Sequence, residues 1–174
     1  MITYILAALT GAIVLVADQF SKIYIQNNFE MAKSYEFLPG IIDITYIHND
    51  GGAWGMLGGY TWLLLSVTIV VMLVCMTLLL KYGAKDKLMF WAIILVLSGG
   101  VGNMIDRIFR GGNVIDFLHF EFWPTFPVFN VADCAIVIGA GLLMLYFVKG
   151  IIDEEKQKRK ANLVTETPQQ DENV

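Results

Sequence analysis

The sequence contains few charged residues. Only 16% of its residues are Asp, Glu, Lys or Arg, whereas 56% are hydrophobic, and the mean hydropathy is +0.61. This composition excludes an ordinary soluble globular domain, in which about 25% of residues are charged, and it predicts a membrane protein. The net charge of −4 averages over segments in different solvents, so it identifies no acidic or basic partner, and we expect no nucleic-acid partner.

Residues that carry nucleophilic or metal chemistry are also scarce. The two cysteines, Cys75 and Cys134, lie in apolar runs, where a thiol is usually a packing residue. Ser98 has no Gly-x-Ser-x-Gly setting, which argues against a serine hydrolase. Asp116 and His119 are a weak metal pair, because no second His or Cys follows at ligand spacing. We therefore expect no metal and no cofactor.

Four stretches are long and apolar enough to cross a membrane, at about residues 3–25, 60–80, 88–106 and 131–148. The run 60–80 carries no charge, and at about 1.5 Å per residue it covers the roughly 30 Å hydrocarbon core of a bilayer. An alternative for the first stretch is a cleaved signal peptide. That alternative is disfavoured, because no Lys or Arg precedes the stretch and it lacks a clear small-x-small cleavage site.

The basic residues predict the orientation of these spans. They gather in the short connection after the second span and in the segment after the fourth span, and basic loops face the cytoplasm. The residues concerned are Lys81, Lys85, Lys87, Lys149, Lys156, Lys158, Arg159 and Lys160. We expect both termini to be cytoplasmic, residues 150–174 to form a charged cytoplasmic tail after a core at 1–149, and the connections 26–59 and 107–130 to lie outside.

Two segments of these outer connections, about 35–57 and 113–123, are predicted to form β-structure. Residues 41–47 are β-branched and aromatic, and they end at the turn-forming run 49–52. The second segment alternates, which predicts one shared face for Val114, Asp116, Leu118, Phe120 and Phe122. The pattern therefore places a carboxyl group in an apolar row.

Ionisable residues occupy the ends of three spans that face the same side. Such residues are costly in a membrane and mark either function or pairing. Most of them also have a structural interpretation. Asp18 and Lys22 form an i, i+4 pair, and Asn130 with Asp133 resembles a helix cap. Asn103, Asp106 and Arg107 share a helix face, on which an Asp–Arg pair can hold the helix against its neighbours.

Asp116 has no such explanation, since no partner lies near it in the sequence. Two carboxyl groups brought close together cannot easily both ionise, so one holds a proton while the other accepts one, which is the arrangement that activates water in aspartic proteases. Asp116 and Asp133 are therefore candidate catalytic residues. Two alternatives remain at this point: a small ion- or proton-coupled transporter that uses the same acids as a relay, and a non-enzymatic scaffold in which the acids only lock helices.

Five segments, in this order along the chain, resemble the motifs of the lipoprotein signal peptidase (signal peptidase II) family of membrane aspartic peptidases. Any one of them is a weak signal, but five in order, placed correctly against four spans, are specific. The segments are Asp18-Gln19-Phe20-Ser21-Lys22, Asn49-Asp50-Gly51-Gly52-Ala53-Trp54, Gly102-Asn103-Met104-Ile105-Asp106-Arg107, Val114-Ile115-Asp116-Phe117 and Phe129-Asn130-Val131-Ala132-Asp133.

The resemblance implies four transmembrane helices with a small outer-face β-cradle and a short periplasmic helix, in a bacterial cytoplasmic membrane with the active site toward the outer leaflet. It also implies an endopeptidase that cleaves diacylglyceryl-modified prolipoproteins just before the lipidated cysteine, with membrane lipid as the other partner. The implied residue roles are a catalytic pair (Asp116, Asp133), substrate-binding or supporting residues (Asn49, Gly51, Asn103, Arg107, Asn130), helix-locking residues (Asp18, Lys22, Asp106) and an interfacial aromatic residue (Trp54).

Overall fold

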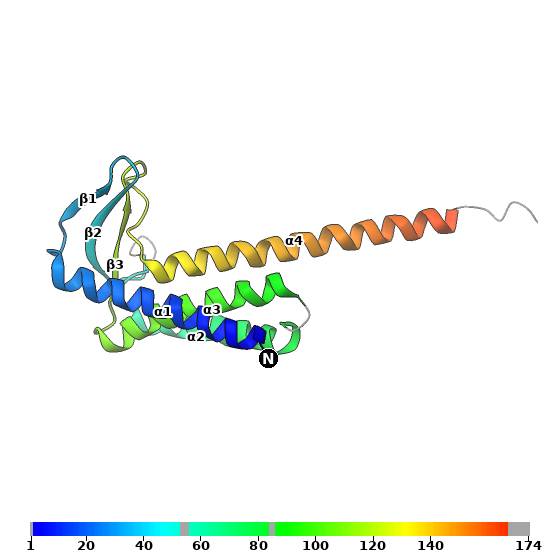
Figure 1. Ribbon diagram of the computed structural model, residues 1–174, viewed down its shortest axis with the longest axis horizontal. Coiled ribbons are helices and arrows are strands. Elements are labelled where there is room, and N and C mark those ends of the chain that lie inside the picture. The colour runs from blue at the N-terminus through cyan, green and yellow to red at the C-terminus, as the bar shows by residue number, and fades with distance from the viewer. Residues whose placement is uncertain (1, 53–55, 84–85, 167–174) are drawn as a thin grey trace, which may run out of the picture.

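A computed structural model of the chain describes residues 2–52, 56–83 and 86–166, with side chains up to residue 162. This part of the chain forms four α-helices and three β-strands (Figure 1). In chain order they are α1 (Ile2–Asn28), β1 (Ser34–Leu38), β2 (Ile42–Asn49), α2 (Thr61–Tyr82), α3 (Lys87–Phe109), β3 (Val114–Phe120) and α4 (Val131–Glu166). The helices run alongside one another, and the strands stand together at one end of them.

All four helices in the described ranges are long and apolar enough to cross a membrane, with mean hydropathies of 1.7, 2.9, 2.0 and 2.2 in chain order. The large apolar side chains of α1, α2 and α4 are mostly exposed on the outside of the bundle, where lipid replaces the protein neighbours of a soluble core. The central helix is α3, since 56% of its apolar window is buried inside the protein against 6% for α2. The prediction of four membrane-spanning helices is confirmed.

Helices α3 and α4 approach each other closely through glycines. A Cβ atom at Gly99 would collide with the carbonyl oxygen of Ala132, and one at Gly139 would lie 2.7 Å from the carbonyl oxygen of Ala92. Small residues permit such backbone contact between helices in a membrane, where tight packing drives helix association. The close approach fixes the first turn of α4, which carries Asp133, against the middle of α3.

The strands form one antiparallel sheet in the order β1-β2-β3. Its buried side packs on the end of α1 through Ile25, Ile44, Tyr46, Ile115 and Phe117. In the register of the last two strands, Ile47 lies opposite Asp116 and Asn49 lies opposite Val114. The sheet therefore places the end of β2 and the start of β3 beside the helix ends.

Some details of the outer segments differ from expectation. Segment 35–57 contains two strands, and β3 ends at Phe120, so Phe122 does not continue its row. Within the described ranges no short helix joins these elements, because residues 56–59 form turns. Trp54 lies outside the described residues.

Helix α4 is longer than its predicted span. It continues past residue 148 to Glu166, and its second half extends beyond the other helices (Figure 1). At about 1.5 Å per residue, its 36 residues measure about 54 Å, well over the thickness of a hydrocarbon core. The apolar stretch therefore ends before the helix does.

Candidate active site

Asp116 and Asp133 line the same cavity, which has a volume of about 530 Å³. Asp116 comes from β3 and Asp133 from the first turn of α4. The cavity has a polar end and an apolar wall. The other polar or charged residues lining it are Asn49, Asn103 and Arg107, and the apolar wall includes Phe120, Phe126, Val128, Phe129, Ile136, Val137 and Ile138.

The Asp116 carboxyl group is buried, with 2% of the residue exposed. Each of its oxygens accepts a hydrogen bond from an asparagine side chain: Oδ1 from Asn130 Nδ2 at 2.6 Å and Oδ2 from Asn49 Nδ2 at 2.7 Å. Burial, followed by the nearby charge of Asp133, raises the pKa of Asp116 from 3.8 to about 7, while the two asparagine donors and Lys22 oppose the rise. Asp116 can therefore hold a proton near neutral pH.

Asp133 is held by the cap of α4. Its backbone N–H donates to Asn130 Oδ1 at 2.9 Å, and its Oδ2 accepts from the backbone N–H of Asn130 at 3.1 Å. This reciprocal pair has the geometry of a capping box, and it confirms the cap predicted from the sequence. The other oxygen, Oδ1, accepts from Asn103 Nδ2 at 2.7 Å. An acid at a helix N-terminus is also stabilised as an anion by the helix dipole.

Two asparagines, Asn103 and Asn130, therefore connect the two carboxyl groups, and Asn49 holds Asp116 alone. Asn130 donates to Asp116 and caps Asp133, and its Nδ2 also lies 3.1 Å from Asn103 Oδ1. Asn49 is itself fixed by the strand turn, because its Oδ1 accepts from Gly51 N at 3.0 Å. The Gly51 N–H thus helps to orient the Asn49 side chain.

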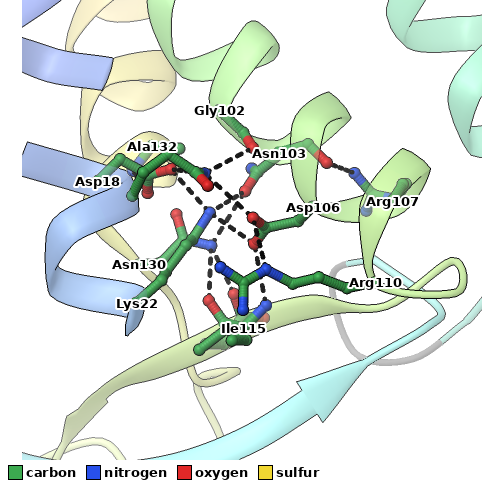
Figure 2. Close-up of polar contacts among 12 residues, drawn as sticks. Asp18, Lys22, Gly102, Asn103, Asp106, Arg107, Arg110, Ile115, Asn130 and Ala132 are labelled. Atoms are coloured by element: carbon green, nitrogen blue, oxygen red, sulfur yellow. Dashed lines mark hydrogen bonds and ion pairs between the residues drawn. The ribbon is translucent and has the colours of Figure 1, made fainter. Parts of the chain in front are cut away.

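Asn103 also contacts a cluster of charged side chains from α1 and the end of α3 (Figure 2). Lys22, Asp18 and Asp106 are fully buried, and the Lys22 ammonium lies 2.9 Å from Asp18 Oδ2 and 3.0 Å from Asp106 Oδ2. Arg110 completes the cluster, with its Nε 3.2 Å from Asp106 Oδ1. Two acids and two bases balance the charge, which a buried ionic cluster requires.

Arg107 does not make the ion pair considered for it. Asp106 pairs with Lys22 and Arg110, whereas the Nη1 of Arg107 reaches only the Asn103 carbonyl oxygen at 3.5 Å. Its buried Nε has no hydrogen-bond partner among the residues the structure describes, and the side chain lines the cavity. Arg107 therefore contributes a positive charge and an unused donor to the cavity wall.

Comparison with known proteins identifies the family. The family model described as signal peptidase (SPase) II matches residues 10–149, which include every candidate site residue. The chain belongs to the signal peptidase II family. It is a peptidase of this type and a multi-pass membrane protein, as the sequence motifs and the four spans predicted.

Curated members of the signal peptidase II family resemble the chain over most of its length. The lipoprotein signal peptidase of Bacillus pumilus is 39% identical over 142 residues, which are 81% of this chain and 89% of that protein. The lipoprotein signal peptidase of Halalkalibacterium halodurans is 37% identical over 163 residues, covering 93% and 99%. A solved bacterial membrane enzyme has a TM-score of 0.77 at 26% identity, covering 97% of this chain and 93% of that one. A second such structure has a TM-score of 0.75 at 31% identity, covering 82% and 92%.

Several residues in and around the site of this signal peptidase II chain were not predicted from the sequence. Gln19 stands in the first motif without an assigned role, yet its Nε2 donates to Asp106 Oδ1 and Asp18 Oδ2, each at 3.0 Å. Arg110 had no predicted role, yet its Nε pairs with Asp106 Oδ1. Cys134, which we expected to be a packing residue, lines the cavity beside Asp133. The i, i+4 spacing of Asp106 and Arg110 was the available signal for that pair.

Proposed function

We propose that the chain is an aspartic endopeptidase that removes the signal peptide from diacylglyceryl-modified bacterial prolipoproteins, cleaving just before the lipidated cysteine. Asp116 and Asp133 are its catalytic residues. The observation that carries the proposal is that two carboxyl groups from different elements line one cavity, with every carboxyl oxygen held by a hydrogen-bond donor. Family membership and the name of the curated relatives support the substrate class.

The environments of the two acids suggest their roles. Asp116, whose pKa is raised to about 7 by burial and by the charge of Asp133, holds the proton. Asp133 lies in the first turn of α4, where the helix dipole favours the anion. Asp133 then takes a proton from water as the water attacks the scissile carbonyl carbon, and Asp116 donates its proton to the carbonyl oxygen. The tetrahedral species collapses as a proton passes to the leaving amine, so no covalent intermediate forms.

The rest of the cavity suits a substrate that is partly lipid. Its apolar wall, built from the segment 126–129 and one side of α4, provides a surface for acyl chains or for the apolar signal helix. Arg107 and the three asparagines supply the polar contacts near the dyad, with Arg107 placed to bind a substrate oxygen through its free Nε–H. Binding of the lipid part holds the peptide bond at the depth of the two acids.

We also propose where the enzyme lies in the cell and how it is oriented in the membrane. The enzyme lies in the bacterial cytoplasmic membrane with both termini in the cytoplasm and the active site toward the outer leaflet, because the basic segments around residues 81–87 and 149–160 favour the cytoplasmic side. The charged end of α4 then projects into the cytoplasm. A transporter is not favoured, since α2 carries no acid and the buried acids of the described residues gather at one end of the bundle.

Purified protein in detergent micelles, incubated with a diacylglyceryl-modified precursor peptide, tests the proposal. We expect cleavage directly before the modified cysteine, located by mass spectrometry and unchanged by a chelator. Asp116→Asn and Asp133→Asn should each abolish cleavage while leaving the protein folded. Asp43→Asn is the matched control, because Asp43 lies on the same sheet opposite His119 and away from the cavity. Cleavage by both dyad variants, or loss of folding in both, contradicts the assignment.

A further inference from the structure

The buried ammonium of Lys22 contacts acceptors on α1 and on α3. Its three N–H donors have three acceptors: Asp18 Oδ2 at 2.9 Å, Asp106 Oδ2 at 3.0 Å and Asn103 Oδ1 at 3.0 Å (Figure 2). An ammonium has three donors, so this one is saturated within the protein. The other hydrogen bonds of these three acceptors show which parts of the site the ammonium holds in place.

The two carboxylates bound to Lys22 each hold the backbone next to a dyad residue. Asp18 Oδ1 accepts from the N–H of Ala132 at 2.9 Å, and Ala132 directly precedes Asp133. Asp106 Oδ2 accepts from the N–H of Ile115 at 3.2 Å, and Ile115 directly precedes Asp116. One cation therefore fixes the backbone of both dyad residues, which come from a strand and from a helix.

The third acceptor, Asn103, acts on the dyad side chains. Its Oδ1 accepts from Lys22 and from Asn130, and its Nδ2 donates to Asp133 Oδ1 at 2.7 Å. A flipped carboxamide would place its NH₂ group against the ammonium and its oxygen against Asp133, so Lys22 enforces the donating orientation. Asn130, held by the same oxygen, donates to Asp116.

We propose that Lys22 is a positioning residue for the dyad, whose ammonium sets the placement and orientation of both carboxyl groups through Asp18, Asp106 and Asn103. The proposal rests on the proposed function, because it takes Asp116 and Asp133 as the catalytic pair. The helix-locking role expected from the sequence accounts for Asp18 and Asp106, but it does not account for the contact with Asn103.

Substitution of Lys22 tests the positioning role. Lys22→Met keeps the length of the side chain but removes the charge and all three donors. We expect kcat on the diacylglyceryl-modified precursor to fall on the order of 100-fold, the loss typical of displaced catalytic groups, with KM unchanged within about threefold. The alkaline limb of the kcat–pH profile should also move to higher pH, because Lys22 lowers the pKa of Asp116. The other charged groups near the dyad are Asp18 on α1 and Asp106, Arg107 and Arg110 at the end of α3, and they remain.

Two further variants separate positioning from stability. In the double variant Lys22→Met with Asp18→Asn, no buried charge is left unpaired, because Asp106 keeps Arg110 and the new asparagine keeps an oxygen for Ala132 N–H. We expect this variant to regain much of the melting temperature lost by Lys22→Met while kcat stays low. Arg110→Gln is the comparison: it removes the same charge from the cluster without touching Asn103, so it should lower the melting temperature but reduce kcat at least about tenfold less than Lys22→Met does.

A double variant with kcat close to wild type would overturn the proposal, as would an equal fall in kcat for Arg110→Gln. Failure of both Lys22 variants to fold would also count against it, because the ammonium would then be a requirement for folding rather than for placement of the dyad. Failure of the proposed function gives a different pattern. Wild-type protein would then not cleave the modified precursor, or Asp116→Asn would still cleave it, whatever the Lys22 variants do.

Discussion

The raised pKa of Asp116 predicts how the stability of the protein depends on pH. The folded protein keeps a proton on Asp116 up to about pH 7, whereas an ordinary aspartic acid loses its proton near 3.8. Between these values the folded state binds a proton that the unfolded chain has lost, so the free energy of unfolding falls as pH rises, and above about pH 7 this fall stops. Asp116→Asn removes the titration, because an amide does not ionise.

The size of the effect follows from the two pKa values. Their difference corresponds to about 4 kcal/mol at 1.36 kcal/mol per pH unit, of which about 2.7 kcal/mol falls between pH 5 and pH 8. Proteins of 150–250 residues change melting temperature by about 2–4 °C per kcal/mol. The melting temperature of Asp116→Asn, measured relative to wild type, should therefore rise by about 5 °C or more from pH 5 to pH 8.

Thermal unfolding in detergent micelles, followed by intrinsic tryptophan fluorescence at pH 5 and pH 8, measures this difference. Asp43→Asn is again the control, since it reports any effect of removing a carboxyl group outside the cavity. A difference between Asp116→Asn and wild type that stays constant with pH would refute the reasoning. A fall in the melting temperature of Asp116→Asn relative to wild type from pH 5 to pH 8 would refute it more strongly, because it would mean that the protein stabilises the charged form of Asp116.

Two other predictions concern helix packing and the end of α4. Gly99→Ala should destabilise the protein by about 1–3 kcal/mol and reduce activity, because the new methyl group meets the Ala132 backbone next to Asp133. Gly141→Ala, whose added Cβ has no atom within 4 Å, should not lower the melting temperature. Deletion of residues 151–174 should leave the melting temperature and kcat unchanged, because every described side chain in 151–162 is exposed. A loss of activity on deletion would show that this segment contributes to catalysis or to a contact that the isolated chain lacks.

The helical part of the fold could be predicted because a bilayer imposes simple rules on sequence. A span needs about 20 apolar residues, so charge-free runs locate the spans. Successive spans alternate in direction, and this alternation shows which helix ends lie on the same side of the membrane. The end of α4 could not be obtained in this way. Hydropathy marks where the apolar stretch ends, but a segment rich in Lys, Glu and Gln is also a good helix former, so the helix continues to Glu166.

The candidate site was predictable only where its contacts are local. The cap formed by Asn130 and Asp133 follows from a spacing of three residues, and the pair of Asp18 with Lys22 follows from a spacing of four. The pairing of Asp106 with Arg110 also follows a spacing of four, but its pairing with Lys22 could not be predicted, because Lys22 lies on another helix whereas Arg107 is adjacent in sequence. Neighbouring helical positions point in different directions, so adjacency in sequence was misleading.

The long-range contacts of the site explain why its polar residues have to act as a group. Asn130 reaches Asp116 only because β3 lies beside the start of α4, and β3 is held there by the hydrogen bond from Ile115 to Asp106. Asp106 in turn lies buried between two bases, Lys22 and Arg110, which balance its charge. The groups that hold the helices together are thus the same groups that fix the backbone beside each proposed catalytic acid. A substitution in the charge cluster should therefore lower activity through geometry even when the protein remains folded. The loss of kcat relative to the loss of melting temperature should be larger for a residue that contacts Asn103 than for one that does not.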